Sequence, residues 1–244
     1  MIEAQGLTKI FRARKRGEIR AVDRVSFCCQ PGHIYGLLGA NGAGKTTTLR
    51  LLATILQPTD GTARVAGFDI KEQPEQVRAR VGFLSTATAL YGRLTARETV
   101  EYFGRLNGLN GSALQRRVEE LFALLAIGAF AERRCDQLST GLKQKVSIAR
   151  TLVHDPPVMI FDEPTVGLDV MTARTIVRFI RDCRDQGKTV IFSTHVMSEA
   201  EKLCDTIGII HDGRLLAEGT LAELRHRVGV EELDEIFVRT VEGA

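Results

Sequence analysis

Short apolar runs recur along the chain and alternate with longer stretches in which apolar and polar positions follow a helical period. A continuous apolar run of about four to eight residues fits a strand that is buried on both faces, so we predict a strand at each run. The predicted strands are residues 2–7, 21–28, 33–38, 62–65, 81–84, 158–161, 189–193 and 206–210. A basic loop over residues 12–20 is predicted to join the first two.

Amphipathic stretches lie between several of these runs, and we predict a helix at each of them. These helices are residues 45 to about 54, 75–80, 171–184 and 197–203. Strands that alternate with helices favour an α/β fold with a mainly parallel sheet. In such a fold the ligand binds at the carboxyl ends of the strands.

A central stretch lacks this alternation, because helical patterns follow one another there without a strand between them: residues 95–106, 114–126 and 139–152. We therefore predict a helical subdomain at about residues 87–155, inserted into a domain that covers residues 1–224. Two further helical patterns, at 221–227 and 231–239, predict a short helical tail, assigned to residues 225–244.

The composition is that of an ordinary globular protein, with 44% hydrophobic and 26% charged residues. A net charge of +3 is too small to indicate nucleic acid as the main partner. The longest apolar stretch, residues 121–130, is about half of what a membrane span needs, so we expect no span in this chain. Five cysteines without disulfide or metal-site spacing predict reduced thiols in a cytosolic protein.

A glycine-rich segment directly follows the predicted strand 33–38 and opens the next helix. Its glycines let the chain curl with the N–H groups pointing inward, which forms an anion cradle. Lys45 is placed to reach the β- and γ-phosphates of a nucleotide, and the Thr46 hydroxyl to hold Mg²⁺. We predict that this P-loop binds a nucleoside triphosphate through Gly39, Ala40, Asn41, Gly42, Ala43, Gly44, Lys45, Thr46 and Thr47. The alternative is a strand-to-helix turn that binds no nucleotide.

Two acids end the apolar run 158–161. In a parallel sheet this places Asp162 and Glu163 at the carboxyl end of the strand, beside the P-loop. Asp162 suits the shell of Mg²⁺, and Glu163 suits a general base that deprotonates the water attacking the γ-phosphate. Without the P-loop, a strand followed by a polar turn at Pro164 would explain the pair equally well.

Ser139 is a natural N-cap for the predicted helix 139–152, which lies just before the strand with the two acids. A P-loop, a helical insert, the sequence Leu138-Ser139-Thr140-Gly141 and an apolar strand ending in Asp-Glu occur here in the order found in ATP-binding-cassette (ABC) transporter ATPases. The sequence Gly167-Leu-Asp169 resembles the D-loop of that family, and His195 follows a strand like its switch histidine. The resemblance covers residues 7 to about 224.

The resemblance implies a fold and a set of roles. The fold is a P-loop NTPase with a RecA-like core, an antiparallel β subdomain and the helical subdomain. Phe11 stands where the family stacks an aromatic ring on adenine, with a buried core residue as the alternative. Ser139, Thr140 and Gly141 would act on the ATP of a second copy in an ATP-induced head-to-tail dimer. His195 would contact the γ-phosphate, or serve as a structural hydrogen bonder.

The chain departs from the family pattern at two places. Leu142 stands where the signature sequence usually has glutamine. Ser85 and Thr86 stand where the family has Pro-Gln, whose glutamine normally touches Mg²⁺ and couples the site to the membrane subunit. Thr86 is shorter and would reach the metal only through water or a moved loop. The sequence near these sites also resembles the ATPase subunits of sodium-export-type bacterial ABC transporters.

These features predict an ATP-hydrolysing subunit, with ATP and Mg²⁺ as cofactors and Lys45, Glu163 and His195 as catalytic residues. It would power a separate transmembrane permease from the cytoplasmic face of the membrane, and the resemblance favours export of sodium or a drug-like solute. A weakly hydrolysing regulatory module is the alternative that Thr86 and Leu142 favour. A cassette ATPase acting on DNA or ribosomes usually has long coiled coils or two cassettes in one chain, and neither occurs here.

Overall fold

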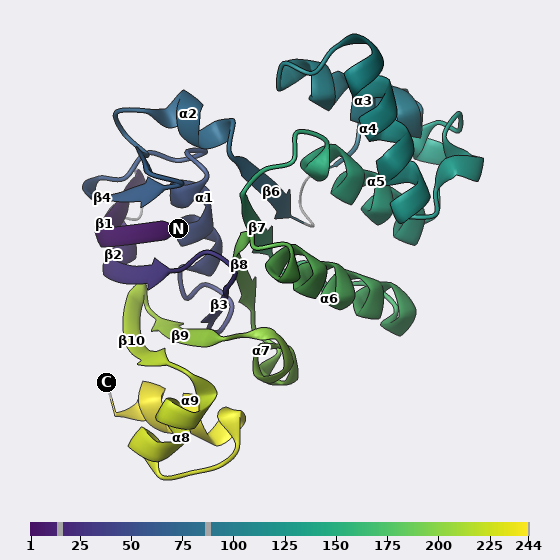
Figure 1. Ribbon diagram of the computed structural model, residues 1–244. Helices are drawn as coiled ribbons and strands as arrows, with labels where there is room; N and C mark the ends of the chain where they lie inside the picture. The colour runs from purple at the N-terminus through teal and green to yellow at the C-terminus, as the bar shows by residue number, and fades with distance from the viewer. Residues whose placement is uncertain (14–16, 86–88, 244) are drawn as a thin grey trace.

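The computed structural model of the protein describes residues 1–13, 17–85 and 89–243. In these residues the strands form one sheet of six strands and one of four. Figure 1 shows the two sheets next to each other, a group of helices (α3, α4 and α5) set to one side, and the C-terminal helices at the opposite end.

The six-stranded sheet has the order β10-β9-β3-β8-β7-β6, and its neighbouring strands are parallel except for the β9–β10 pair. Its strands are β3 (Ile34–Leu38), β6 (Val81–Ser85), β7 (Val158–Asp162), β8 (Thr189–Thr194), β9 (Thr206–His211) and β10 (Arg214–Gly219). The helices that follow its strands include α1 (Lys45–Leu52), α6 (Val170–Asp185) and α7 (Met197–Leu203). This arrangement confirms the predicted α/β fold with a mainly parallel sheet.

The side chains of β7 show why the central strands are continuous apolar runs. Val158 and Ile160 pack into the cluster that contains α1 and the four-stranded sheet. Met159 and Phe161 pack into the opposite cluster, which contains α6 and the helices α3 to α5. Both faces of this strand are therefore covered, so its polar residue comes only where the strand ends.

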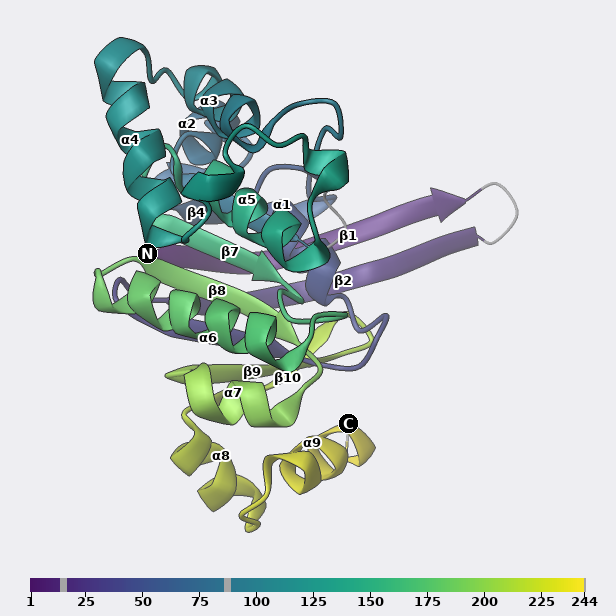
Figure 2. The same ribbon diagram turned by 90° about the vertical axis from the view of Figure 1, so that its right-hand side faces the viewer.

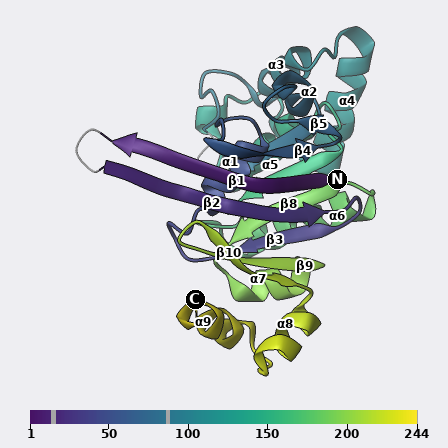
Figure 3. The ribbon, with the colours of Figure 1, turned by 90° about the vertical axis from the view of Figure 1, so that its left-hand side faces the viewer.

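The four-stranded sheet is antiparallel and confirms the predicted β subdomain (Figure 3). It has the order β2-β1-β4-β5, with β1 (Ile2–Ala13), β2 (Gly17–Cys29), β4 (Asp60–Val65) and β5 (Phe68–Asp69). The short edge strands β5 and β10 were not predicted, because neither has a continuous apolar run.

The first two strands are longer than predicted. We expected them to end at Leu7 and to begin at Ala21, with a basic loop over residues 12–20 between them. Instead β1 and β2 form a hairpin that extends beyond the body of the protein, as Figure 2 shows. Its outer residues, such as Phe11 opposite Ile19, are exposed, so no apolar pattern marks them. The backbone ladder holds this part together. Residues 14–16 of the predicted basic loop lie outside the described residues.

The helical group contains α3 (Ala96–Leu106), α4 (Gly111–Leu124) and α5 (Thr140–Leu152). Thr95 and Glu98 form a capping box at the start of α3. Short 3-10 helices, η1 (Gly128–Phe130) and η2 (Cys135–Gln137), connect α4 to α5, and α2 (Pro74–Arg78) precedes β6. The boundaries predicted for the helical subdomain remain a prediction, because residues 86–88 are not described.

The tail forms α8 (Leu221–Val228) and α9 (Leu233–Glu242), which pack against α7, β9 and β10 through an apolar cluster. Leu224, Leu233 and Ile236 are almost fully buried in that cluster. Among the helices that the structure describes, none combines the length and the apolar character that crossing a membrane requires.

Candidate functional site at the carboxyl end of the parallel sheet

The P-loop joins β3 to α1 and is held in place by its own lysine. The Nζ atom of Lys45 donates to the carbonyl oxygens of Gly39 and Ala40, at 2.7 and 3.0 Å. Gly42 and Gly44 have φ angles of 85° and 105°, in the left-handed region that favours glycine. The helix α1 begins without a side-chain cap and has no acidic residue in its first turn. Its first N–H groups and its dipole therefore suit an anion.

Gly44 cannot carry a side chain without moving the loop. A Cβ atom added there would lie 2.5 Å from the carbonyl oxygen of Ala21, and the residue's φ is 105°. We expect Gly44→Ala to lower the free energy of unfolding by about 1–3 kcal/mol and to weaken Mg-ATP binding at least about 10-fold, through this strain. Thermal melting with and without Mg-ATP measures both effects. Gly128→Ala is the control, because a Cβ there meets nothing within 4 Å; equal melting and binding for both variants would contradict this account.

Asp162 ends β7 and is almost fully buried, with 4% of its surface exposed. Its Oδ1 atom accepts hydrogen bonds from the hydroxyls of Thr46 and Ser193, each at 2.9 Å. Ser85 on β6 lies on the other side, with its Oγ atom 3.5 Å from Oδ2. The sheet register explains this arrangement, because Asp162 pairs with Ser85 on one side and with Ser193 on the other. The carboxylate is therefore fixed beside the first turn of α1.

Glu163 is the next residue and turns toward the P-loop. Its φ of 47° lies in the left-handed region, which is unusual for a residue with a long side chain. Its Oε1 atom lies 3.2 Å from Nζ of Lys45 and 3.4 Å from Nδ1 of His195. Lys45 is almost fully buried, whereas the side chains of Glu163 and His195 are 21% and 39% exposed. The structure thus brings the three predicted catalytic side chains together.

Lys45 and Glu163 border a cavity of about 280 Å³, which is lined by Ala21, Asn41, Gly42, Gly44, Lys45, Thr46, Thr47 and Glu163. A larger cavity of about 520 Å³ lies near β6 and includes Arg50, Phe103 and His154. The smaller cavity is the better candidate site, because it joins the anion-binding loop, a lysine and a carboxylate. The Thr46 hydroxyl and the Asp162 carboxylate are hard oxygen ligands, which suit Mg²⁺. The site therefore fits a nucleoside triphosphate with its metal.

Comparison with known proteins identifies the family of this chain. The family model described as ABC transporter matches residues 22–166, which is more than half of the chain. The chain belongs to the ABC transporter family. It is 41% identical to the ABC transporter ATP-binding protein NatA of Bacillus subtilis, over 98% of this chain and 97% of that protein. It is also 41% identical to the Nod factor export ATP-binding protein I of Paraburkholderia xenovorans, over 85% of this chain and 68% of that protein.

Among solved structures, the chain resembles an ATP-binding cassette, MJ0796, in a dimeric post-hydrolysis state bound to ADP and Pi. The TM-score is 0.81 at 26% identity, over 90% of this chain and 98% of that one. These comparisons confirm the predicted P-loop fold and family. This ABC protein is an ATP-binding and ATP-hydrolysing subunit that serves transport.

The signature sequence of this ABC cassette lies at the start of α5. Ser139 is the N-cap, and its Oγ atom accepts a hydrogen bond from the Leu142 N–H at 3.4 Å. Ser139, Thr140 and Gly141 are not among the residues that line the P-loop cavity. Gly141 instead lies close to α6, because a Cβ added to it would be 3.1 Å from the Thr172 hydroxyl. The signature sequence is therefore not part of the P-loop cavity of its own chain.

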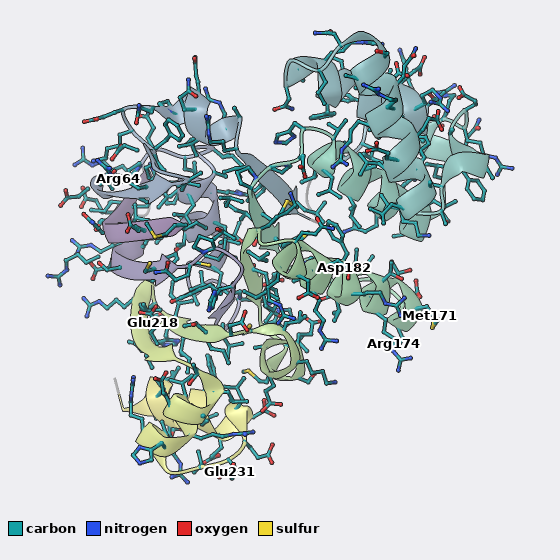
Figure 4. The ribbon with its side chains drawn as sticks, in the orientation of Figure 1. Arg64, Met171, Arg174, Asp182, Glu218 and Glu231 are labelled. Atoms are coloured by element: carbon teal, nitrogen blue, oxygen red, sulfur yellow. The ribbon has the colours of Figure 1, made fainter. Side chains whose placement is uncertain are left out.

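Asp169 of the D-loop is the N-cap of α6. Its carboxylate accepts hydrogen bonds from the Thr172 hydroxyl and from the N–H groups of Met171 and Thr172. The bond from the Thr172 hydroxyl, together with these N–H groups, lowers the pKa of the Asp169 carboxyl. Met171 and Arg174, labelled in Figure 4, lie just beyond it at the exposed end of α6. Thr172 therefore contacts Asp169 and lies near Gly141.

The remaining predicted site residues are less closely connected to the cavity. Phe11 lies on the outer part of the β1–β2 hairpin, 38% exposed, with Nζ of Lys9 5.3 Å from its ring centre. Ala21, nearer the base of the hairpin, borders the cavity instead. Stacking of Phe11 on adenine stays a prediction. Thr86 lies outside the described residues.

The sequence did not predict two contacts of Asp162, although Ser85 was noted as a departure from the family pattern. Ser193 and Ser85 both contact Asp162, but serines at the ends of strands carry no pattern of their own. The parallel pairing of β6, β7 and β8 brings them to the same row of the sheet. Only the sheet order could have revealed them.

Proposed function

We propose that Lys45, Thr46, Asp162, Glu163 and His195 form the ATP-hydrolysing centre of this transporter subunit. The supporting observation is that two consecutive acids meet two consecutive P-loop residues: Thr46 with Asp162 at 2.9 Å, and Lys45 with Glu163 at 3.2 Å. A structural turn would not need a buried lysine at the start of a helix with two acidic side chains beside that helix. A phosphate-binding site with a general base needs both the lysine and the acidic side chains.

Each side chain has a distinct role in this proposal. Lys45 binds the β- and γ-phosphates, and the P-loop N–H groups bind the same oxygens. Thr46 and Asp162 hold Mg²⁺, which when bound neutralises charge on the phosphate oxygens. Glu163 orients the attacking water and accepts its proton. His195, 3.4 Å from Glu163, steadies that carboxylate and contacts the γ-phosphate.

We further propose that the active form is a head-to-tail dimer with two ATP molecules at its interface. In this dimer the α5 N-terminus of one copy, with Ser139, Thr140 and Gly141, faces the γ-phosphate bound by the other copy. Placement of the signature away from its own P-loop cavity supports this arrangement. The dimeric state of the MJ0796 cassette also supports it.

The partner in the membrane is a separate permease subunit, and the chain docks onto it at the cytoplasmic face. We propose export as the direction of transport, which the Nod factor export relative supports. Sodium or a drug-like molecule is the proposed solute. Steady-state phosphate release from the purified subunit, with and without the permease, separates this motor function from a regulatory module that hardly hydrolyses ATP.

The dimer is tested by light scattering on the Glu163→Gln variant. We expect the molecular mass to double when Mg-ATP is added and to remain that of a monomer with ADP or without nucleotide, because the γ-phosphate completes the interface. Replacing Gly141 by Arg should abolish the doubling, since a large side chain at the start of α5 keeps the second copy away. A mass that is the same with and without Mg-ATP would contradict the proposed dimer.

A further inference from the structure

The hydroxyl of Ser193 contacts both acids of the site. Ser193 lies on β8 and is fully buried. Its Oγ atom lies 2.9 Å from Oδ1 of Asp162 and 3.0 Å from the backbone nitrogen of Glu163. One buried side chain thus connects the residue assigned to the metal with the residue assigned to the water.

The chemistry of the groups fixes the direction of both hydrogen bonds. The Glu163 N–H can only donate, so Oγ of Ser193 accepts from it. The hydroxyl proton is then left to donate to the Asp162 carboxylate, which is an acceptor when ionised. The pairing of Asp162 with Ser193 across β7 and β8 sets this geometry, and burial keeps water from replacing either bond.

The bond to the Glu163 N–H occurs where the backbone is strained. Glu163 has a φ of 47°, and a non-glycine residue in this region needs surrounding contacts to hold it there. The direction in which the Glu163 side chain leaves the backbone depends on this conformation. Its Oε1 atom meets Lys45 and His195 only because the chain turns at this point.

We propose that Ser193 is a positioning residue for ATP hydrolysis. It orients the Asp162 carboxylate toward the metal and holds Glu163 in the left-handed conformation that aims its carboxylate at the water. This inference rests on the proposed roles of Asp162 and Glu163. Ser193 touches neither the nucleotide nor the water in this scheme, and it acts through the two acids.

Replacing Ser193 by alanine should affect both acids together. We expect kcat to fall about 10-fold, the effect of about one lost hydrogen bond to a charged or buried group. The Mg²⁺ concentration at half-maximal activity should rise several-fold, because Asp162 is no longer held on one side. KM for Mg-ATP at saturating Mg²⁺ should stay within about twofold, because the P-loop contacts are unchanged. Ser193→Thr keeps the hydroxyl and should recover most of kcat.

A second measurement does not depend on hydrolysis. In the Glu163→Gln background, the thermal shift produced by ATP is followed as Mg²⁺ is titrated. Adding Ser193→Ala should move the midpoint of this titration to several-fold higher Mg²⁺. The control is Thr99→Val, which removes a fully buried hydroxyl from α3, away from the cavity. It should change the melting temperature without moving the Mg²⁺ midpoint.

The outcomes separate three cases. A Ser193→Ala variant with wild-type kcat and an unmoved Mg²⁺ midpoint overturns the positioning role, whatever its melting temperature. If Ser193→Thr does not fold, the Mg²⁺ titration of the alanine variant still tests the positioning role of Ser193. Wild-type hydrolysis by the Glu163→Gln single variant would instead contradict the proposed function itself, and it is measured independently of Ser193.

Discussion

Replacing Glu163 by glutamine will lower the steady-state rate of ATP hydrolysis by about 100-fold or more, the usual contribution of a general base. Glutamine has nearly the same size and can still accept a hydrogen bond from Lys45, but its amide cannot take the proton of the attacking water at neutral pH. The backbone hydrogen bond from Glu163 to Ser193 does not involve the side chain and remains. Phosphate release by the purified variant measures the loss.

ATP binding should survive this change. The contacts of the P-loop with phosphate come from backbone N–H groups and Lys45, and none of them uses the Glu163 carboxylate. Binding without turnover should therefore be visible as a thermal shift with Mg-ATP that is at least as large as that of the wild type. Glu132→Gln is a matched control, because its side chain is 74% exposed and pairs with Arg97 in the helical group. Full hydrolysis by Glu163→Gln would mean that another group is the base.

Lys45→Ala will raise the dissociation constant of Mg-ATP by about 100- to 1,000-fold. The ammonium is proposed to donate to both the β- and the γ-phosphate, and a hydrogen bond to a charged group contributes about 1.5–3 kcal/mol. The substitution also removes the cation beside Glu163, so the unpaired Glu163 carboxylate, which borders the same cavity, repels the phosphates of the nucleotide. Titration calorimetry or the loss of the thermal shift with Mg-ATP measures this effect.

The control for this variant is Lys71→Ala, since Lys71 is an exposed lysine that does not border the cavity. Its affinity for Mg-ATP should equal that of the wild type. The unliganded Lys45→Ala protein should still fold, because the lysine contacts the loop and not the apolar clusters. Wild-type affinity in a folded Lys45→Ala variant would show that the nucleotide binds elsewhere.

The central strands and the longer helices could be predicted because burial imposes a pattern on them. Apolar runs marked β3, β7 and β8, and helical spacing marked α3, α5 and α6, close to the ends that the structure gives. The hairpin β1–β2 was predicted too short, and β5 and β10 were missed. These segments are held by backbone pairing with the neighbouring strand of a hairpin, which leaves no continuous apolar run in the sequence.

The candidate site, too, could be predicted only in part from the sequence. The P-loop, Asp162 and Glu163 lie in short sequence motifs, so the sequence alone was enough to predict that they lie beside one another. The contacts of Ser193 and Ser85 with Asp162 depend on the order of strands in the sheet. The closeness of Gly141 to Thr172 also depends on the order of strands, because the two residues lie on α5 and α6, which follow different strands.

The sequence by itself determined that this chain is a P-loop protein of the ABC transporter family, because phosphate binding requires particular residues within a single strand–turn–helix segment. The tertiary structure decided how the acids are held. The hydrogen bond of 2.9 Å between Ser193 and Asp162 depends on the register of β7 and β8, two strands about thirty residues apart. Both strands are buried at every position, so neither has an alternating pattern that would show which of their residues pair.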